Sequence, residues 1–169
     1  AANGSSCAAL GAQRDGRVVV GGSSFGDSAK VFATRLLSTG AADPLFRADA
    51  ATDVLSDVTA LAIGADDSIA LAGYPRSGVP GALVVRLQAD GLLDLVFGRN
   101  GSTTIDLESD SEVWPRVNDM QVLADGAILM AGGGWGWDSW SGNPFVARLL
   151  GNASGGGPGV ADFVVTDHE

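Results

Sequence analysis

Three tryptophans crowd one short segment of the sequence. Trp135, Trp137 and Trp140 lie within the glycine- and serine-rich stretch 132–142, and the chain has four tryptophans in all. Indole faces stack on sugar rings, and tryptophan is also frequent where two proteins meet. The segment is therefore a candidate binding loop for a glycan or a protein. The alternative is that these rings pack over the end of the fold or into a neighbouring chain.

A second candidate is the acidic run 106–112, in which Asp106, Glu108 and Asp110 supply alternate carboxylates. Calcium takes six to eight oxygen ligands. The run has neither the spacing nor the glycine of an EF-hand loop, so a solvated acidic loop is the main interpretation and a calcium site the alternative. No other cofactor is expected.

Groups for covalent or acid–base catalysis are sparse. His168 is the only histidine and lies one residue from the end, and Cys7 is the only cysteine, so an internal disulfide is excluded and a nucleophilic triad or zinc site lacks partners. A glycosidase needs two carboxylates at a defined separation, and nothing selects a pair among the 20 acidic residues. We expect no enzyme, with a glycan hydrolase or lyase as the remaining catalytic hypothesis.

Three arginines occupy matching positions inside apolar segments: Arg35, Arg86 and Arg148. A guanidinium in apolar surroundings needs a carboxylate and hydrogen bonds. Asp43 and Asp94 follow the first two arginines at the same distance, which predicts a repeated structural clamp. Recognition of a ligand carboxylate or phosphate is the alternative.

The arginines belong to an internal repeat. Similar turn-and-strand blocks occur at 15–22, 66–73 and 125–132, and each is followed by an arginine segment at 32–36, 83–87 or 145–149. A third block, 40–46, recurs at 91–97, whereas the third copy runs into a glycine-rich stretch at 155–159. Several blocks in the same order indicate one structural unit used about three times.

The amino-acid composition indicates that the repeated unit is built of strands and turns. Of 169 residues 25 are glycine, and aspartate greatly outnumbers glutamate and lysine, which favours turns over helices. The mean hydropathy of +0.21 argues against disorder. We predict strands at 18–20, 58–63, 69–72, 102–107, 117–123 and 128–131, besides the three arginine segments. Four short strands per unit are typical of a β-propeller blade, and a single β-sandwich is the competing all-β fold.

Unit two carries a specific resemblance. Its segment 84–101 contains Val-Val-Arg-Leu, then Asp90-Gly91, Asp94, Phe97-Gly98 and Asn100-Gly101, which resembles the delta-60 repeat family of bacterial proteins. The resemblance covers residues 12–150 and implies β-propellers in large secreted or surface-attached proteins, without shared catalytic residues. The chain departs from the pattern where Asp67-Ser68 and Thr39-Gly40 replace Asp-Gly, and where the last unit lacks the Asp-x-x-Phe block.

The expected organisation is a propeller-like array in residues 1–150, with units at about 1–50, 51–107 and 108–150. Residues 151–169 are expected to form a glycine-rich exit segment and terminal strand. Closed propellers typically have 4–8 blades, so three units predict an incomplete ring. Copies would then associate through the repeat ends into a ring or filament, or the units would complete a longer chain. Pairing of residues 1–12 with a neighbouring chain would support assembly, and pairing within the chain would weaken it.

The negative net charge of the chain argues against two classes of partner. The net charge is -10 and basic residues form no cluster, which excludes nucleic acid and anionic membrane surfaces. No apolar run reaches the roughly 20 residues of a membrane span. The expectation is a non-catalytic structural or interaction module, extracellular or at the cell surface, that self-associates. A carbohydrate-binding module that uses the tryptophan loop is the alternative.

Overall fold

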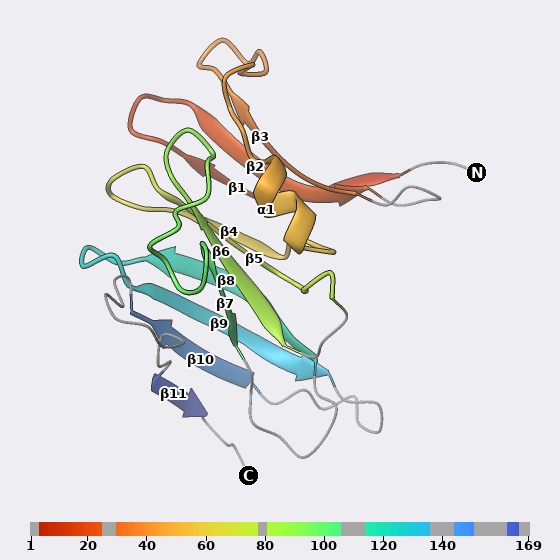
Figure 1. Ribbon diagram of the computed structural model, residues 1–169, viewed down its shortest axis with the longest axis vertical. Helices are drawn as coiled ribbons and strands as arrows, with labels where there is room; N and C mark the ends of the chain where they lie inside the picture. Colours follow the sequence, from red (N-terminus) through yellow and green to blue (C-terminus); the bar gives the residue numbers. More distant parts are fainter. Residues whose placement is uncertain are drawn as a thin grey trace.

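Three antiparallel sheets follow one another along the chain, and each is a meander of neighbouring strands (Figure 1). This computed structural model describes residues 4–24, 30–77, 81–105, 114–135, 144–150 and 162–165. Blade 1 contains β1 (Ser5–Ala12), β2 (Val18–Ser24) and β3 (Val31–Leu36). Blade 2 contains β4 (Ala60–Ile63), β5 (Ile69–Gly73), β6 (Ala82–Leu87) and β7 (Ser102–Ile105). Blade 3 contains β8 (Trp114–Val122), β9 (Ile128–Trp135), β10 (Pro144–Leu149) and β11 (Asp162–Val165).

The arrangement confirms the all-β prediction of propeller-like blades that do not close into a ring. The first strands of the blades lie beside one another, β1 next to β4 and β4 next to β8. The terminal strand β11 pairs with β10 and is therefore the fourth strand of blade 3. The first strand, β1, pairs with β2 of its own chain. Within the described part, no helix has the length and apolar character needed to cross a bilayer.

The hairpin between the first two strands of each blade has the same turn. Gly16, Asp67 and Gly126 all adopt a left-handed backbone, with φ of 83°, 64° and 80°. Glycine takes this conformation freely and aspartate tolerates it, which explains why Asp67 can stand where the other copies have glycine. In each turn an aspartate side chain accepts a hydrogen bond from the amide two residues later, at Asp15, Asp66 and Asp125.

Blade 1 departs from the four-strand pattern. In blade 2 a turn with left-handed Gly98, Asn100 and Gly101 leads the chain from Phe97 into β7. The residues that follow Phe46 in blade 1 contain no glycine, and the chain forms α1 (Asp49–Val54) instead. This helix packs beside β3 and buries Ala51 completely. The helix therefore takes the place of a fourth strand, which the repeat alone did not predict.

Each blade has two unlike faces. In blade 2 one face carries larger side chains, which we call the large-residue face: Leu61, Ile69, Leu71, Leu83, Val85 and Leu87. The opposite face, which we call the small-residue face, carries Ala60, Ala62, Ala70, Ala72, Ala82 and Val84. Side chains alternate between the faces because successive residues of a strand point to opposite sides.

The two blade junctions use these faces in the same order. The large-residue face of blade 2 packs in one core cluster with Val19 and Val31, from the small-residue face of blade 1. The small-residue face of blade 2 packs with the large-residue face of blade 3, which carries Ile128, Met130, Phe145, Ala147 and Leu149. Both junctions therefore place a large-residue face on a small-residue face. The large-residue face of blade 1 and the small-residue face of blade 3 are left at the two ends.

Candidate functional site

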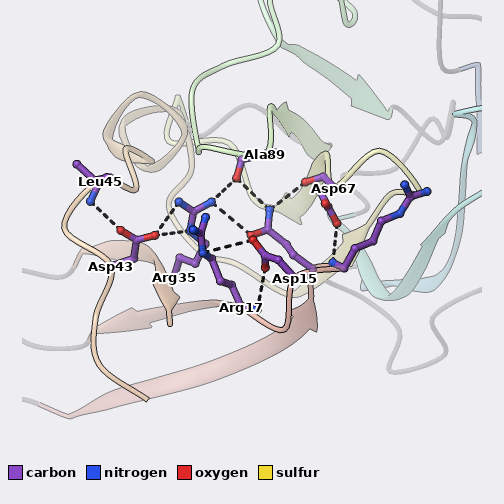
Figure 2. A network of polar contacts seen from close by, with 9 residues as sticks. Asp15, Arg17, Arg35, Asp43, Leu45, Asp67 and Ala89 are labelled. Carbon is purple, nitrogen blue, oxygen red and sulfur yellow. Dashed lines mark hydrogen bonds and ion pairs between the residues drawn. The ribbon is translucent and has the colours of Figure 1, made fainter. Parts of the chain in front are cut away.

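A network of polar contacts in the described part of the chain is centred on Arg35 of β3 (Figure 2). Its Nε and Nη2 atoms lie 2.8 and 2.7 Å from Oδ2 of Asp43, and both side chains are buried. The guanidinium lies over the Phe46 ring, 5.0 Å from its centroid. The other carboxylate oxygen of Asp43 accepts a hydrogen bond from the amide of Leu45. That amide, helped by Arg35, holds the pKa of Asp43 below its ordinary value.

The same arginine reaches across the junction to blade 2. Its Nη1 donates to the carbonyl of Ala89 at 2.6 Å and to Oε1 of Gln13 at 3.3 Å. The Gln13 amide nitrogen donates to the same Ala89 carbonyl at 2.9 Å and to the carbonyl of Asp67 at 3.1 Å. The backbone amide of Arg14 donates to the Asp67 carboxylate at 2.8 Å. This network fastens the turns of blade 1 to those of blade 2.

Arg86 repeats the arrangement one blade later. Its Nε donates to Oδ2 of Asp94 at 2.6 Å, and the two side chains are 9% and 17% exposed. The guanidinium lies 4.7 Å from the centroid of the Phe97 ring. Oδ1 of Asp94 accepts the amide of Val96, as Oδ1 of Asp43 accepts that of Leu45. The two arginine–aspartate pairs that the sequence analysis matched are therefore in contact, each in a clamp with an aromatic ring and a turn amide.

Arg148 differs from the predicted buried clamp. It pairs with Asp125, in the turn before β9, and the two side chains are 37% and 57% exposed. The third copy has no Asp-x-x-Phe block to supply a carboxylate, and Arg148 lies on the small-residue face at the end of the array. Arg148 occupies the same position on its strand as Arg35 and Arg86, but its side chain is partly exposed to solvent.

The arrangement bears on the ligand-receptor hypothesis for the arginines. Every terminal nitrogen of Arg35, and its Nε, donates to a protein oxygen. A ligand carboxylate or phosphate would have to displace either Asp43, which would leave a buried carboxylate without its countercharge, or the Gln13 and Ala89 oxygens that join the two blades. The geometry of this clamp is that of a structural fastening.

The other candidates from the sequence are placed only in part. Trp135 ends β9 and stands opposite Trp114, the first residue of β8. Trp137 and Trp140, His168, and the acidic residues Asp106, Glu108 and Asp110 lie outside the described residues. Cys7 is on β1 and exposed. Among the residues that the structure describes, no three His, Cys, Asp or Glu side chains are grouped to hold a metal ion.

The large-residue face of blade 1 forms a second candidate site. Leu10 is 69% exposed, whereas the matching residues Leu61 and Met120 are each 7% exposed. Cys7 is likewise exposed where the other blades bury valine, at Val58 and Val117. Four further apolar side chains of this face are only half-buried: Val18, Val20, Phe32 and Leu36. All six positions match side chains that are buried between blades elsewhere in the molecule.

The small-residue face of blade 3 is the opposite end. Ala131 and Val146 are exposed, whereas the matching Ala72 and Val84 of blade 2 are completely buried. The strand β8 adds two exposed polar residues to this face, Asp119 and Gln121, at positions where blade 2 has alanine. The end face therefore carries apolar residues on β9 and β10, namely Leu129, Ala131, Pro144 and Val146, together with Arg148, and it is polar along β8.

Sequence reasoning did not find the junction network around Gln13. Its hydrogen bonds join residues 54 and 76 positions apart, and no periodic pattern in the chain marks that glutamine. The open faces did leave a signal, because aligning the repeats places Leu10 with Leu61 and Met120 once the strand register is known.

Comparison with known families agrees with this geometry. Residues 13–46 and 64–97 match the model of a β-propeller domain of unknown function, DUF5122. Each matched segment starts at the hairpin turn of its blade and ends at the clamp phenylalanine, Phe46 or Phe97. No curated protein matches the chain. The first two blades are therefore similar to the DUF5122 β-propeller family, which is of the delta-60 repeat kind that the sequence resembles.

Proposed function

We propose that this chain is a non-catalytic propeller module, secreted or at the cell surface, that associates through its end blades. The observation that carries the proposal is the exposure of Leu10, Cys7 and their neighbours on a face whose counterparts are buried in the other two blades. Burying a leucine side chain contributes about 1.5–3 kcal/mol, so an open face of several such residues favours association.

The route of association is packing of faces. Residues 5–12 pair with β2 of the same chain, which weakens the expectation that the start of the chain completes a sheet in a neighbour. That pairing argues against assembly by strand exchange. It leaves the exposed blade faces as the surfaces that meet.

The remaining parts of the proposal rest on the sequence. The single histidine and single cysteine argue against catalysis, and the resemblance to secreted and surface proteins supports an extracellular location. The net charge of -10 suits a soluble module that avoids nucleic acid and anionic membranes.

Sedimentation equilibrium over a concentration series tests the association. We expect an average mass that rises above the 17.0 kDa of one chain. Leu10→Ser should weaken the association. Leu45→Ser is the matched control, because Leu45 is 74% exposed yet lies in the clamp block and not on the open face. A mass of one chain at every concentration would contradict the proposal.

A second candidate function is carbohydrate binding by the tryptophan loop. The register of β8 and β9 favours it, because Trp114 stands opposite Trp135 where the loop leaves the sheet. We expect glycan-array binding that disappears in the Trp135→Ala, Trp137→Ala double variant while the circular dichroism spectrum is retained. Binding that is unchanged in this variant, or absent from the natural chain, would remove the candidate.

A further inference from the structure

We infer that the open large-residue face of blade 1 packs on the small-residue face of blade 3 in a second copy of this chain. The inference rests on the proposed association and adds its partner, its direction and its contacts. Two copies joined head to tail in this way at both ends would form a ring of six blades, within the usual range of 4–8.

The first argument is the order of faces. Both junctions inside the molecule place a large-residue face on a small-residue face. Head-to-tail packing of two copies repeats that order, whereas two blade 1 faces packed together would put large side chains against large ones. Protein interiors are packed to near-crystal density, so a large-residue face on a small-residue face is favoured over two large-residue faces.

The second argument comes from individual contacts. At the junction of blades 1 and 2, a Cβ atom at Gly21 would lie 3.1 Å from the Val58 side chain. The residues that match Val58 and Gly21 on the open faces are Cys7 and Ala131, and both are exposed. Packing of a second copy would therefore bring Cys7 of one copy against Ala131 of the next.

Side-chain sizes also match at a neighbouring position. Gly11 lies so close to Ile63 that a Cβ atom there would come 2.5 Å from the isoleucine side chain. On the open faces the matching residues are Gln121 and Ala12. The longer residue on blade 3 thus faces a shorter one on blade 1, which leaves room for the glutamine.

The third argument is the position of Arg148. Its counterpart Arg35 crosses a junction to the carbonyl of Ala89, in the turn after β6. The turn after β3 has the same backbone hydrogen bonds as the turn after β6. The Leu37 amide donates to the Ala41 carbonyl and the Gly40 amide to the Leu37 carbonyl. In the turn after β6 the Gln88 amide donates to Leu92 and the Gly91 amide to Gln88. The carbonyl that matches Ala89 is that of Ser38. In a head-to-tail junction Arg148 would donate to Ser38 of the second copy.

The polar residues Asp119 and Gln121 set the strength of this junction. They lie on β8, where the internal junctions have glycine or alanine, so less apolar area is buried there. We therefore expect a reversible junction that depends on protein concentration.

A disulfide trap tests the direction. Cys7 is the only cysteine of the chain, so Ala131→Cys adds one partner thiol at the position that would lie against Cys7 in the proposed junction. Under mild oxidation we expect covalent dimers that are cleaved by reductant. The variant Ala131→Cys with Cys7→Ser, and a variant with Ala65→Cys on an exposed turn, are the controls and should remain largely uncrosslinked.

The outcomes separate this inference from the proposed function. If the mass rises with concentration but the natural chain forms Cys7–Cys7 dimers and Ala131→Cys adds none, the copies meet face to face and the head-to-tail inference is wrong. If the mass does not rise at all, the proposed association itself fails.

A variant at Arg148 gives an independent readout. A hydrogen bond from a charged donor is worth a factor of about 10 or more in affinity, so Arg148→Gln should raise the dissociation constant by about that factor. Asp125→Asn releases Arg148 from its present partner and should not weaken association. Equal dissociation constants for Arg148→Gln and the natural chain would overturn the role of Arg148 in the junction.

Discussion

Methionine in place of Arg86 should destabilise the fold far more than the same change at Arg148, although the two arginines share one repeat position. Methionine keeps an apolar stem of similar length and removes every donor. At Arg86 it leaves the Asp94 carboxylate, 17% exposed, without its countercharge. Breaking a buried pair costs about 3–5 kcal/mol, and the remaining exposure of Asp94 places this case near the lower figure. At Arg148 the pair with Asp125 is exposed, and its loss costs about 0–1 kcal/mol.

Urea unfolding followed by tryptophan fluorescence and far-ultraviolet circular dichroism measures the difference. For a domain of this length, about 3 kcal/mol corresponds to roughly 6–12 °C in the thermal midpoint. The measurements should be made at concentrations where the natural chain is a monomer, so that association does not contribute. Equal shifts for Arg86→Met and Arg148→Met would refute the assignment of the clamp as a buried fastening.

Three further predictions concern single positions. The Leu45 amide holds the pKa of Asp43 below 3.8, so the ionised Asp43 stabilises the fold fully above that pH, and this stabilisation is lost as the pH falls through the lowered pKa. The urea midpoint should therefore fall less steeply between pH about 5 and 2 in Asp43→Asn than in the natural chain. Parallel pH profiles of the two proteins would argue against this role of Asp43. Leu61→Ala should lower the free energy of unfolding by about 2–5 kcal/mol and Leu10→Ala by less than about 0.5 kcal/mol, since only Leu61 is buried; similar thermal shifts would contradict this contrast. Gly101→Ala should cost about 1–2 kcal/mol in urea unfolding because φ is 88° there, and an unchanged midpoint would show that the turn tolerates a side chain.

Much of the fold was predictable from short-range sequence patterns. The Asp-Gly turns and the apolar runs after them are local features, and the structure confirms strands that begin at Val18, Ile69 and Ile128. The pairing of Arg35 with Asp43 was also within reach, because the two residues are close in sequence and recur together. Those features depend on backbone preferences and on the cost of burying an unpaired charge.

The remainder depends on contacts that the repeat does not encode. The helix α1 arises because the residues after Phe46 lack the glycines that turn the chain after Phe97. The pairing of Arg148 with Asp125 arises because no later block supplies a carboxylate. Gln13 bonds to turns of another blade, and only the packing of two blades brings those groups together. A pattern within one repeat does not show which polar groups of a neighbouring blade its side chains will meet.

The alternation of large and small faces has a consequence for how such arrays change length. Blade 2 carries both halves of a junction, one on each face, so duplication of this unit would create a new junction that is already complementary. Loss of a unit likewise joins two surfaces that fit. An array built in this way can gain or lose such a unit without compensating substitutions in its interior.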